Sequence, residues 1–242
     1  MKILFHSYLT LILCGFFVFS IAHSRNPCTP FGMRIALGKI YNNPSSNETV
    51  SLWFNTDSEC ARSFSLIKRS SSEIEKLYCS SWKTGLPEYK TFIHKCSITS
   101  VMKGDSFEYM VFGWTGNQSD PAIPFLKENI KAKIPTGNKI KMINLADWSY
   151  LVLKKGEYDP LDDSFDQLLN SNVQIDVLYI NGDIAYDLDS NNGRNYEEFI
   201  VMLSQVGMHW PIIINTGNHE RYSKEDTTLL NNSFETYGNT VN

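Results

Sequence analysis

VQIDVLYINGD at residues 173–183 and PIIINTGNH at residues 211–219 decide the fold of this chain. Each stretch is a short apolar run that ends in glycine and polar residues, which is typical of a buried strand followed by a tight turn. A third run of this kind spans Ile140–Leu145. Helical patterns lie between the runs, around Phe165–Leu169 and over Glu197–Val206. This alternation of strands and helices predicts a parallel α/β sheet.

Polar side chains follow the three predicted strands at regular intervals. Asp147, Asp183 and Asn218 are 36 and then 35 residues apart, about one strand–helix–strand unit each time. Ligands bind beyond the carboxyl ends of parallel strands, so we expect these side chains to converge at one edge of the sheet. Their oxygens suit hard or borderline metal ions, and one carboxylate can bridge two ions. Gly182 and Gly217 would allow tight turns and a close backbone approach beside the ions.

The region before these strands has a different pattern. Short runs of β-branched and aromatic residues alternate with turn-forming clusters, which predicts a small all-β sandwich. The expected strands lie at Arg34–Leu37, Val50–Phe54, Phe64–Ile67, Thr91–Ile93 and Phe107–Phe112. Glycines and prolines then punctuate a polar stretch. We therefore expect a β-sandwich over residues 25–120, a linker over 121–138, and an α/β domain over 139–242.

Residues 1–24 are typical of a signal peptide. Lys2 precedes an apolar run, and Ala22 and Ser24 are small residues at the positions that a signal peptidase reads. The alternative is a membrane anchor, but the run falls short of the ~20 residues that a membrane span needs. We therefore expect an exported protein with no membrane attachment after cleavage of the leader.

Cysteine usage and sequons agree with export. After the leader, the chain holds Cys28, Cys60, Cys79 and Cys96. Four cysteines in an exported chain suggest two disulfides with three alternative connectivities; zinc is the rival interpretation, although there is no C-x-x-C pair. Asn47, Asn117 and Asn231 each begin an N-x-[ST] sequon for glycosylation. The net charge of −4 argues against a nucleic-acid partner, which would require a strong basic patch.

Two of the polar motifs resemble those of a known family. Gly182-Asp183-Ile184-Ala185-Tyr186 is similar to the GDxxY motif of purple acid phosphatases, and Gly217-Asn218-His219-Glu220 is similar to their GNH[DE] motif. Asp147-Trp148-Ser149 stands where that family has DxG. Thr29–Leu37, the strand around Trp53 and the stretch from His94 to Tyr109 resemble the family's fibronectin-III-like domain. The resemblance covers roughly residues 28–240 and implies that the α/β region is part of a metallophosphoesterase domain.

The resemblance implies a binuclear Fe(III)–M(II) centre, in which the divalent ion is Zn, Fe or Mn. Asp147 would bind the ferric ion, Asp183 would bridge both ions, and Tyr186 would bind iron as a phenolate. Asn218 would bind the divalent ion, and His219 would be the catalytic residue that contacts the phosphate and assists proton transfer. The implied activity is an acid phosphatase acting on small phosphomonoesters. The expected location is outside the cell or in the lumen of the secretory or lysosomal pathway, and a homodimer is compatible with the resemblance.

The chain also departs from the family pattern. Ser149 replaces the glycine of the first motif, and the later VxxH and GHxH motifs do not occur in residues 220–242. The resemblance therefore implies a C-terminally truncated site, and we expect this chain alone to be inactive. Two alternatives stay open: a non-catalytic binding module, or a phosphodiesterase or nucleotide hydrolase on the same scaffold. Tyr186 favours the purple acid phosphatase type over other metallophosphoesterases, which generally have a histidine where Ser149 stands.

Overall fold

The computed structural model describes most of the β-rich region and the core of the α/β region. The described residues are 26–37, 48–69, 73–85, 90–101, 104–135, 140–146, 167–170, 175–183, 194–215 and 217–218. The expected signal peptide lies outside them. Within the described ranges, no helix has the length and apolar character that crossing a membrane requires.

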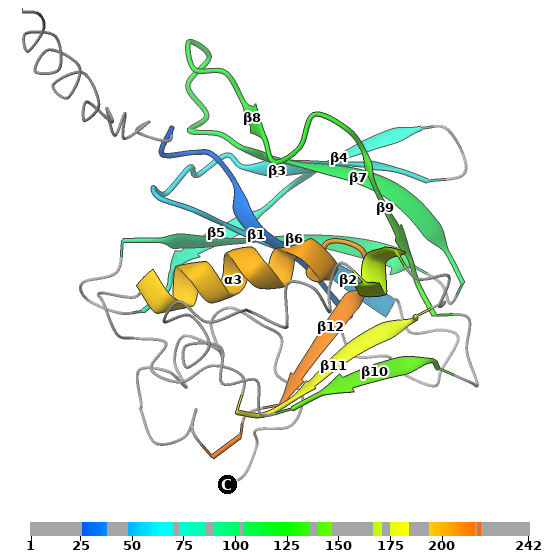
Figure 1. The fold of residues 1–242 in the computed structure, drawn as a ribbon. Coiled ribbons are helices and arrows are strands. Elements are labelled where there is room, and N and C mark those ends of the chain that lie inside the picture. Colours follow the sequence, from blue (N-terminus) through cyan, green and yellow to red (C-terminus); the bar gives the residue numbers. More distant parts are fainter. Residues whose placement is uncertain are drawn as a thin grey trace, which may run out of the picture.

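Twelve strands and one long helix make up the described fold (Figure 1). The strands are β1 (Phe31–Leu37), β2 (Glu48–Thr56), β3 (Phe64–Lys68), β4 (Ile74–Tyr78), β5 (Ser80–Lys83), β6 (Phe92–Val101), β7 (Ser106–Gly113), β8 (Ile123–Pro124), β9 (Ile130–Lys133), β10 (Met142–Leu145), β11 (Val177–Asn181) and β12 (Pro211–Asn215). The helix is α3 (Arg194–Gly207). Residues 167–170 are also helical, within the stretch where a helix was expected.

Two sheets contain all of these strands. The larger has the order β10-β11-β12-β1-β2-β6-β5, and the smaller has the order β4-β3-β7-β8 with β9 paired to β7. Facing side chains of the two sheets form a buried core that includes Leu52, Phe54, Ile67, Tyr109 and Val111. The five strands expected in this region are all present. The larger sheet is mixed: β10, β11, β12 and β1 are parallel neighbours, whereas β1, β2, β6 and β5 are antiparallel.

Strand β1 joins the two regions that the sequence separates. It pairs with β2 on one side, and on the other side Ile35 and Ala36 pair with Pro211 and Ile212 of β12. The α/β strands therefore extend the sheet of the sandwich. Residues 121–138, expected as a linker, contribute β8 and β9 to the smaller sheet. The division into two domains stays a prediction.

Helix α3 covers one face of the parallel strands (Figure 1). Its apolar side Tyr196, Phe199, Ile200 and Leu203 is fully buried and packs in one cluster with residues of β11 and β12. The spacing of these residues is the helical repeat expected from the sequence. Gly32 of β1 has φ 62°, and a Cβ there would collide with Cγ2 of Ile200. This glycine therefore permits the close approach of α3 to β1.

A buried polar network also ties α3 to the sandwich. Nη1 of Arg34 donates to the carbonyl of Gly32 at 2.7 Å and to Oδ1 of Asn55 at 3.0 Å. Nδ2 of Asn55 donates to the hydroxyl of Tyr196 at 3.3 Å. Burial lowers the pKa of the Arg34 guanidinium. Because unpaired buried polar groups are costly, these bonds fix the position of α3 relative to β1 and β2.

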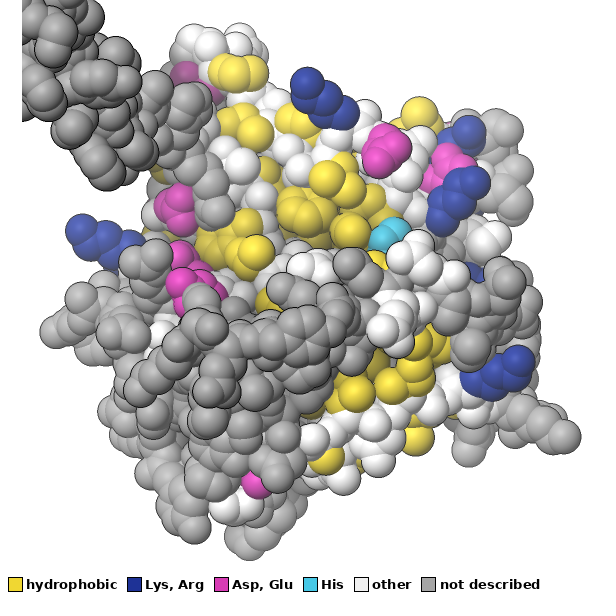
Figure 2. Space-filling view, in the orientation of Figure 1, with side chains coloured by type: hydrophobic (Ala, Val, Ile, Leu, Met, Phe, Trp, Pro, Cys, Tyr) yellow, Lys and Arg dark blue, Asp and Glu magenta, His cyan; other side chains and the backbone are white. Residues whose placement is uncertain are grey.

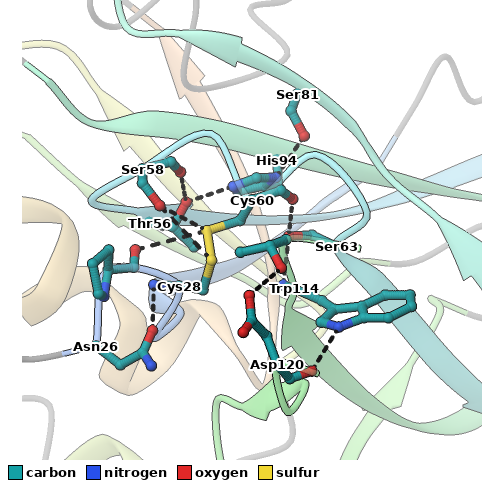
Figure 3. Close-up of a disulfide and its surroundings, with 12 residues drawn as sticks. Asn26, Cys28, Thr56, Ser58, Cys60, Ser63, Ser81, His94, Trp114 and Asp120 are labelled. Atoms are coloured by element: carbon teal, nitrogen blue, oxygen red, sulfur yellow. Dashed lines mark hydrogen bonds between the residues drawn. A yellow bond between two sulfur atoms is a disulfide. The ribbon is translucent and has the colours of Figure 1, made fainter. Parts of the chain in front are cut away.

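Two disulfides close the sandwich region. Cys28 is joined to Cys60 with Cα atoms 5.7 Å apart, and Cys79 is joined to Cys96 with Cα atoms 4.1 Å apart. Of the three connectivities that the sequence allows, the structure has this one. The first bridge ties the start of β1 to the loop after β2 (Figure 3). Two disulfides are typical of a protein that folds outside the cytosol.

His94 lies in the sandwich core near the Cys28–Cys60 bridge (Figure 3). The hydroxyl of Thr56 donates to the carbonyl of Ser58 at 2.6 Å, so it accepts a hydrogen bond from Nε2 of His94 at 2.7 Å. Nδ1 then accepts from the hydroxyl of Ser81 at 2.6 Å. The ring stacks on Phe54 with centroids 4.8 Å apart. Burial lowers the pKa of His94 to about 3, so the imidazole is neutral and structural.

Candidate metal centre

The strand register brings the ends of three parallel strands together. Leu145 of β10 pairs with Ile180 of β11, and Asn181 of β11 pairs with Asn215 of β12. The segments that follow these strands therefore leave the sheet at the same edge. This is the edge at which the sequence predicts convergence of Asp147, Asp183 and Asn218.

The backbone turns sharply after β11. Gly182 has φ 74° and Asp183 has φ 49°, so two consecutive residues adopt the left-handed region. That region is unusual for a residue with a side chain and costs about 1 kcal/mol or more. Gly182 is buried and Asp183 is half-buried. The turn places Asp183 against Gly217, which lies two residues after β12.

Gly217 allows the two motifs to touch. A Cβ at Gly217 would collide with Oδ1 and the backbone nitrogen of Asp183 and would lie 2.8 Å from its Cγ. Glycine is therefore the residue type that fits, because the neighbour includes backbone that cannot rotate away. The sequence predicts a close backbone approach at this position, and the structure has one against Asp183; the expected approach to metal ions stays a prediction.

The side chains of Asp183 and Asn218 meet at this edge. With its nitrogen turned toward Asp183, the Asn218 amide donates to Oδ2 at 2.9 Å and to Oδ1 at 3.3 Å. With its oxygen turned that way, three oxygen atoms face one another, which a cation between them would stabilise. The exposed Asn218 and half-buried Asp183 keep the position open to ligands.

Two asparagines that the sequence reasoning missed form a hydrogen-bonded layer at the strand ends that precede this contact. Oδ1 of Asn181 accepts from the hydroxyl of Tyr179 at 3.2 Å and from Nδ2 of Asn215 at 3.4 Å. Asn181 and Asn215 are the last residues of adjacent strands and each precedes a glycine-containing motif. The repeated asparagine at the end of both apolar runs was the available signal. These residues link the two strand ends that carry Asp183 and Asn218.

Three of the five predicted site residues, Asp147, Tyr186 and His219, lie outside the described residues. Ala146, directly after β10, is the last described position before Asp147. Across the described ranges, no group of three or more His, Cys, Asp and Glu side chains is placed to hold a metal ion. Asp183 and Asn218 have oxygens suited to a hard or borderline cation, but such an ion takes about four to six ligands. They fit one part of a metal site, and the remaining ligands must come from elsewhere.

Figure 2 shows the same face of the molecule as Figure 1, with hydrophobic side chains over the region of β10–β12. In β10, at the edge of the sheet, Met142 is 54% exposed, and Ile140 just before the strand is 51% exposed. Among the described residues, helix α3 therefore covers one face of the parallel strands and leaves side chains at the β10 edge exposed. The candidate centre lies at the end of these strands and not within the apolar surface.

The fold of this chain was compared with those of known proteins. No protein-family model and no curated protein matches the chain. The chain is similar in structure to a purple acid phosphatase isolated from yellow lupin (Lupinus luteus) seeds, with a TM-score of 0.59 and 15% sequence identity. The match covers 84% of this chain and 39% of the lupin chain. At this identity the likeness shows a shared fold, and the chain spans well under half the length of that protein.

Proposed function

We propose that this chain is part of a metal-dependent phosphoesterase of the purple acid phosphatase type, acting on small phosphomonoesters. The observation that carries the proposal is the meeting of Asp183 and Asn218 at the ends of adjacent parallel strands. Gly217 has no room for a side chain beside Asp183, which ties the two motifs into one unit. The fold shared with the lupin phosphatase supports the same assignment.

In this proposal each motif contributes ligands to an Fe(III)–M(II) pair, in which M is Zn, Fe or Mn. Asp183 presents two carboxylate oxygens and would bridge both ions, while the amide oxygen of Asn218 would bind the divalent ion. Asp147 and Tyr186 would complete the ferric side as a carboxylate and a phenolate. When bound, such a pair withdraws electron density from the phosphoryl oxygens and lowers the pKa of a bound water.

The chain's own groups then have separate tasks. The Asp183 carboxylate would offset part of the positive charge of the ions, and the Asn181–Asn215 layer links the strand ends that lead to both proposed ligands. His219 follows Asn218 directly and would contact the phosphate and hold a proton for the leaving oxygen.

The experiment loads the secreted chain with iron and zinc and measures bound metal, the visible spectrum, and hydrolysis of p-nitrophenyl phosphate from pH 4 to 8. We expect bound metal and a visible band that Tyr186→Phe removes. The control Tyr78→Phe changes an exposed tyrosine of the sandwich strand β4 and should leave the band unchanged. A band that survives Tyr186→Phe would refute the phenolate assignment.

The hydrolysis arm separates this proposal from a non-catalytic binding module. Metal-dependent turnover that Asp183→Asn abolishes supports an enzyme. Stoichiometric metal binding without turnover agrees with the expectation that residues 1–242 alone are inactive, so only the presence of turnover decides between the two. Failure to bind iron, zinc or manganese would overturn the proposed centre.

A further inference from the structure

We propose that Asn117 is an N-glycosylation site, so that this protein carries an N-linked glycan on the loop between β7 and β8. Asn117-Gln118-Ser119 is a sequon, the sequence that oligosaccharide transfer requires. The other two sequons, at Asn47 and Asn231, lie outside the described residues. The structure supplies independent reasons at Asn117, in its exposure, its side-chain geometry and the construction of its loop.

The side chain of Asn117 is exposed and leaves its reactive nitrogen available. Its Oδ1 accepts a hydrogen bond from the backbone nitrogen of Ser119 at 3.2 Å, which forms an Asx-turn within the sequon. Its own backbone nitrogen donates to the hydroxyl of Thr115 at 3.1 Å. Both bonds use other atoms, so Nδ2 has no hydrogen-bond partner among the described residues. A sugar on Nδ2 would therefore displace no contact of the described fold.

The loop holds its shape without that nitrogen. Nε1 of Trp114 donates to the carbonyl of Asn117 at 3.2 Å and to that of Asp120 at 3.0 Å. The hydroxyl of Thr115 donates to Oδ2 of Asp120 at 2.9 Å. Trp114 is itself anchored to the sandwich, since its backbone nitrogen donates to the hydroxyl of Ser63 at 3.3 Å (Figure 3). The loop thus presents Asn117 outward on a rigid base.

The transfer needs a donor that the export pathway supplies, a lipid-linked oligosaccharide with a pyrophosphate leaving group. Nδ2 of Asn117 attacks C1 of the first sugar, the bond from C1 to the pyrophosphate oxygen breaks, and the amide gives up one proton. The lipid pyrophosphate leaves, with no change in oxidation state. The two disulfides agree with folding in the same oxidising compartment.

The position of the proposed glycan is far from the candidate metal centre. The loop after β7 lies at one end of the molecule in Figure 1, and the ends of β11 and β12 lie at the opposite end. The glycan would shield the outer end of the sandwich and not the edge that carries Asp183 and Asn218. Removal of the glycan should therefore leave metal binding unchanged.

The test is translation of the full chain with microsomes, followed by peptide mass mapping before and after release of the glycan by a peptide N-glycosidase, an amidase that converts the glycosylated Asn to Asp. We expect the peptide containing Asn117 to carry a glycan and to be recovered with Asp at that position after release. Asn117→Gln and Ser119→Ala should each remove one glycan, whereas the matched variants Gln118→Ala and Ser119→Thr should keep it. The two groups of variants separate loss of the sequon from disturbance of the loop.

The proposal fails if imported chains contain unmodified Asn117, even where Asn47 or Asn231 is glycosylated. It fails equally if the chain is not imported at all, because Asn117 would then never meet the donor. Neither result bears on the metal centre, so this inference stands or falls independently of the proposed function.

Discussion

The sandwich and the parallel strands use polar side chains in opposite ways. In the sandwich, the polar side chain of His94 is directed inward and hydrogen-bonded: it bonds to Thr56 and Ser81, and disulfides close the surrounding loops. At the ends of β11 and β12, polar groups are directed outward, and Asp183 meets Asn218 at the surface. The difference indicates that the sandwich stabilises the chain while the parallel strands present its chemistry. Substitutions in the first region should change stability alone, and substitutions in the second should change ligand binding.

The largest effect on stability should follow removal of the Cys28–Cys60 bridge. The paired change Cys28→Ser and Cys60→Ser opens a loop whose ends are 32 residues apart in the sequence and should lower the free energy of unfolding by about 4 kcal/mol. Urea unfolding followed by fluorescence measures this. Metal binding by the folded variant should be unchanged. A loss of less than about 1 kcal/mol would show that the bridge constrains the unfolded chain less than loop-closure entropy requires.

His94 should make the sandwich sensitive to acid. Its pKa is lowered by burial from 6.5 to about 3, so the unfolded chain binds more protons between these pH values. The free energy of unfolding therefore falls as the pH drops through that window, by about 2 kcal/mol between pH 7 and pH 5. In His94→Gln, which cannot take up a proton, the slope of stability against pH should decrease by that amount.

The control for this measurement is His209→Gln. Burial also lowers the pKa of His209. In His209→Gln the slope of stability against pH should therefore decrease, but by less than in His94→Gln. If His94→Gln keeps the full slope of stability against pH of the unsubstituted protein, the assignment of a neutral imidazole to buried His94 is wrong.

Gly217→Ala should affect both stability and metal binding, because Gly217 follows β12 and packs directly against Asp183. The added methyl group collides with Asp183 and should cost about 1.5 kcal/mol as overpacking, with loss of metal binding. Gly207→Ala is the matched control: its Cβ would lie 2.7 Å from Cδ1 of Ile212, within the parallel region but away from the site. Equal metal binding by the two variants would contradict the role given to Gly217.

Asn215→Ala should have the smallest effect on stability and still weaken the site. Asn215 is exposed, so the free energy of unfolding should change by less than about 0.5 kcal/mol. Its bond to Asn181 is lost, and metal affinity should fall by roughly 10-fold or more. Titration with zinc followed by calorimetry measures this. Unchanged affinity would show that the asparagine layer does not position the ligands.

The sequence predicted those parts of the fold that have strong periodicity. The helix at Glu197–Val206 and the strand at Pro211–Asn215 were both expected, because a buried helical face and a buried strand each require a regular apolar pattern. Strands β4 and β5 were missed. Strand β4 reads IEKLY and is mostly exposed, so its pairing with β3 leaves little apolar signal. The pairing of β1 with β12 was also not expected, because contacts between strands distant in sequence leave no local pattern.

The candidate site was predictable where residue type alone carries the chemistry. Asp183, Asn218 and the requirement for Gly217 follow from the strand-end motifs, and the structure brings these residues together. The roles of Asp147, Tyr186 and His219 stay predictions. The Asn181–Asn215 layer was not predicted, since its bond depends on the register between β11 and β12, which the sequence does not specify.

The most direct test of the central claim is metal binding by Asp183→Asn compared with Asp176→Asn. Asp176 precedes β11 at the opposite end of the strand, where its Oδ2 accepts from the backbone nitrogen of Lys141 at 2.9 Å. Both variants remove one carboxylate charge next to the same strand, and their metal content is measured after loading with iron and zinc and dialysis. The account predicts that Asp183→Asn loses the bound metal and Asp176→Asn retains it. Equal retention, or loss in Asp176→Asn alone, would contradict a metal centre at the carboxyl ends of β11 and β12.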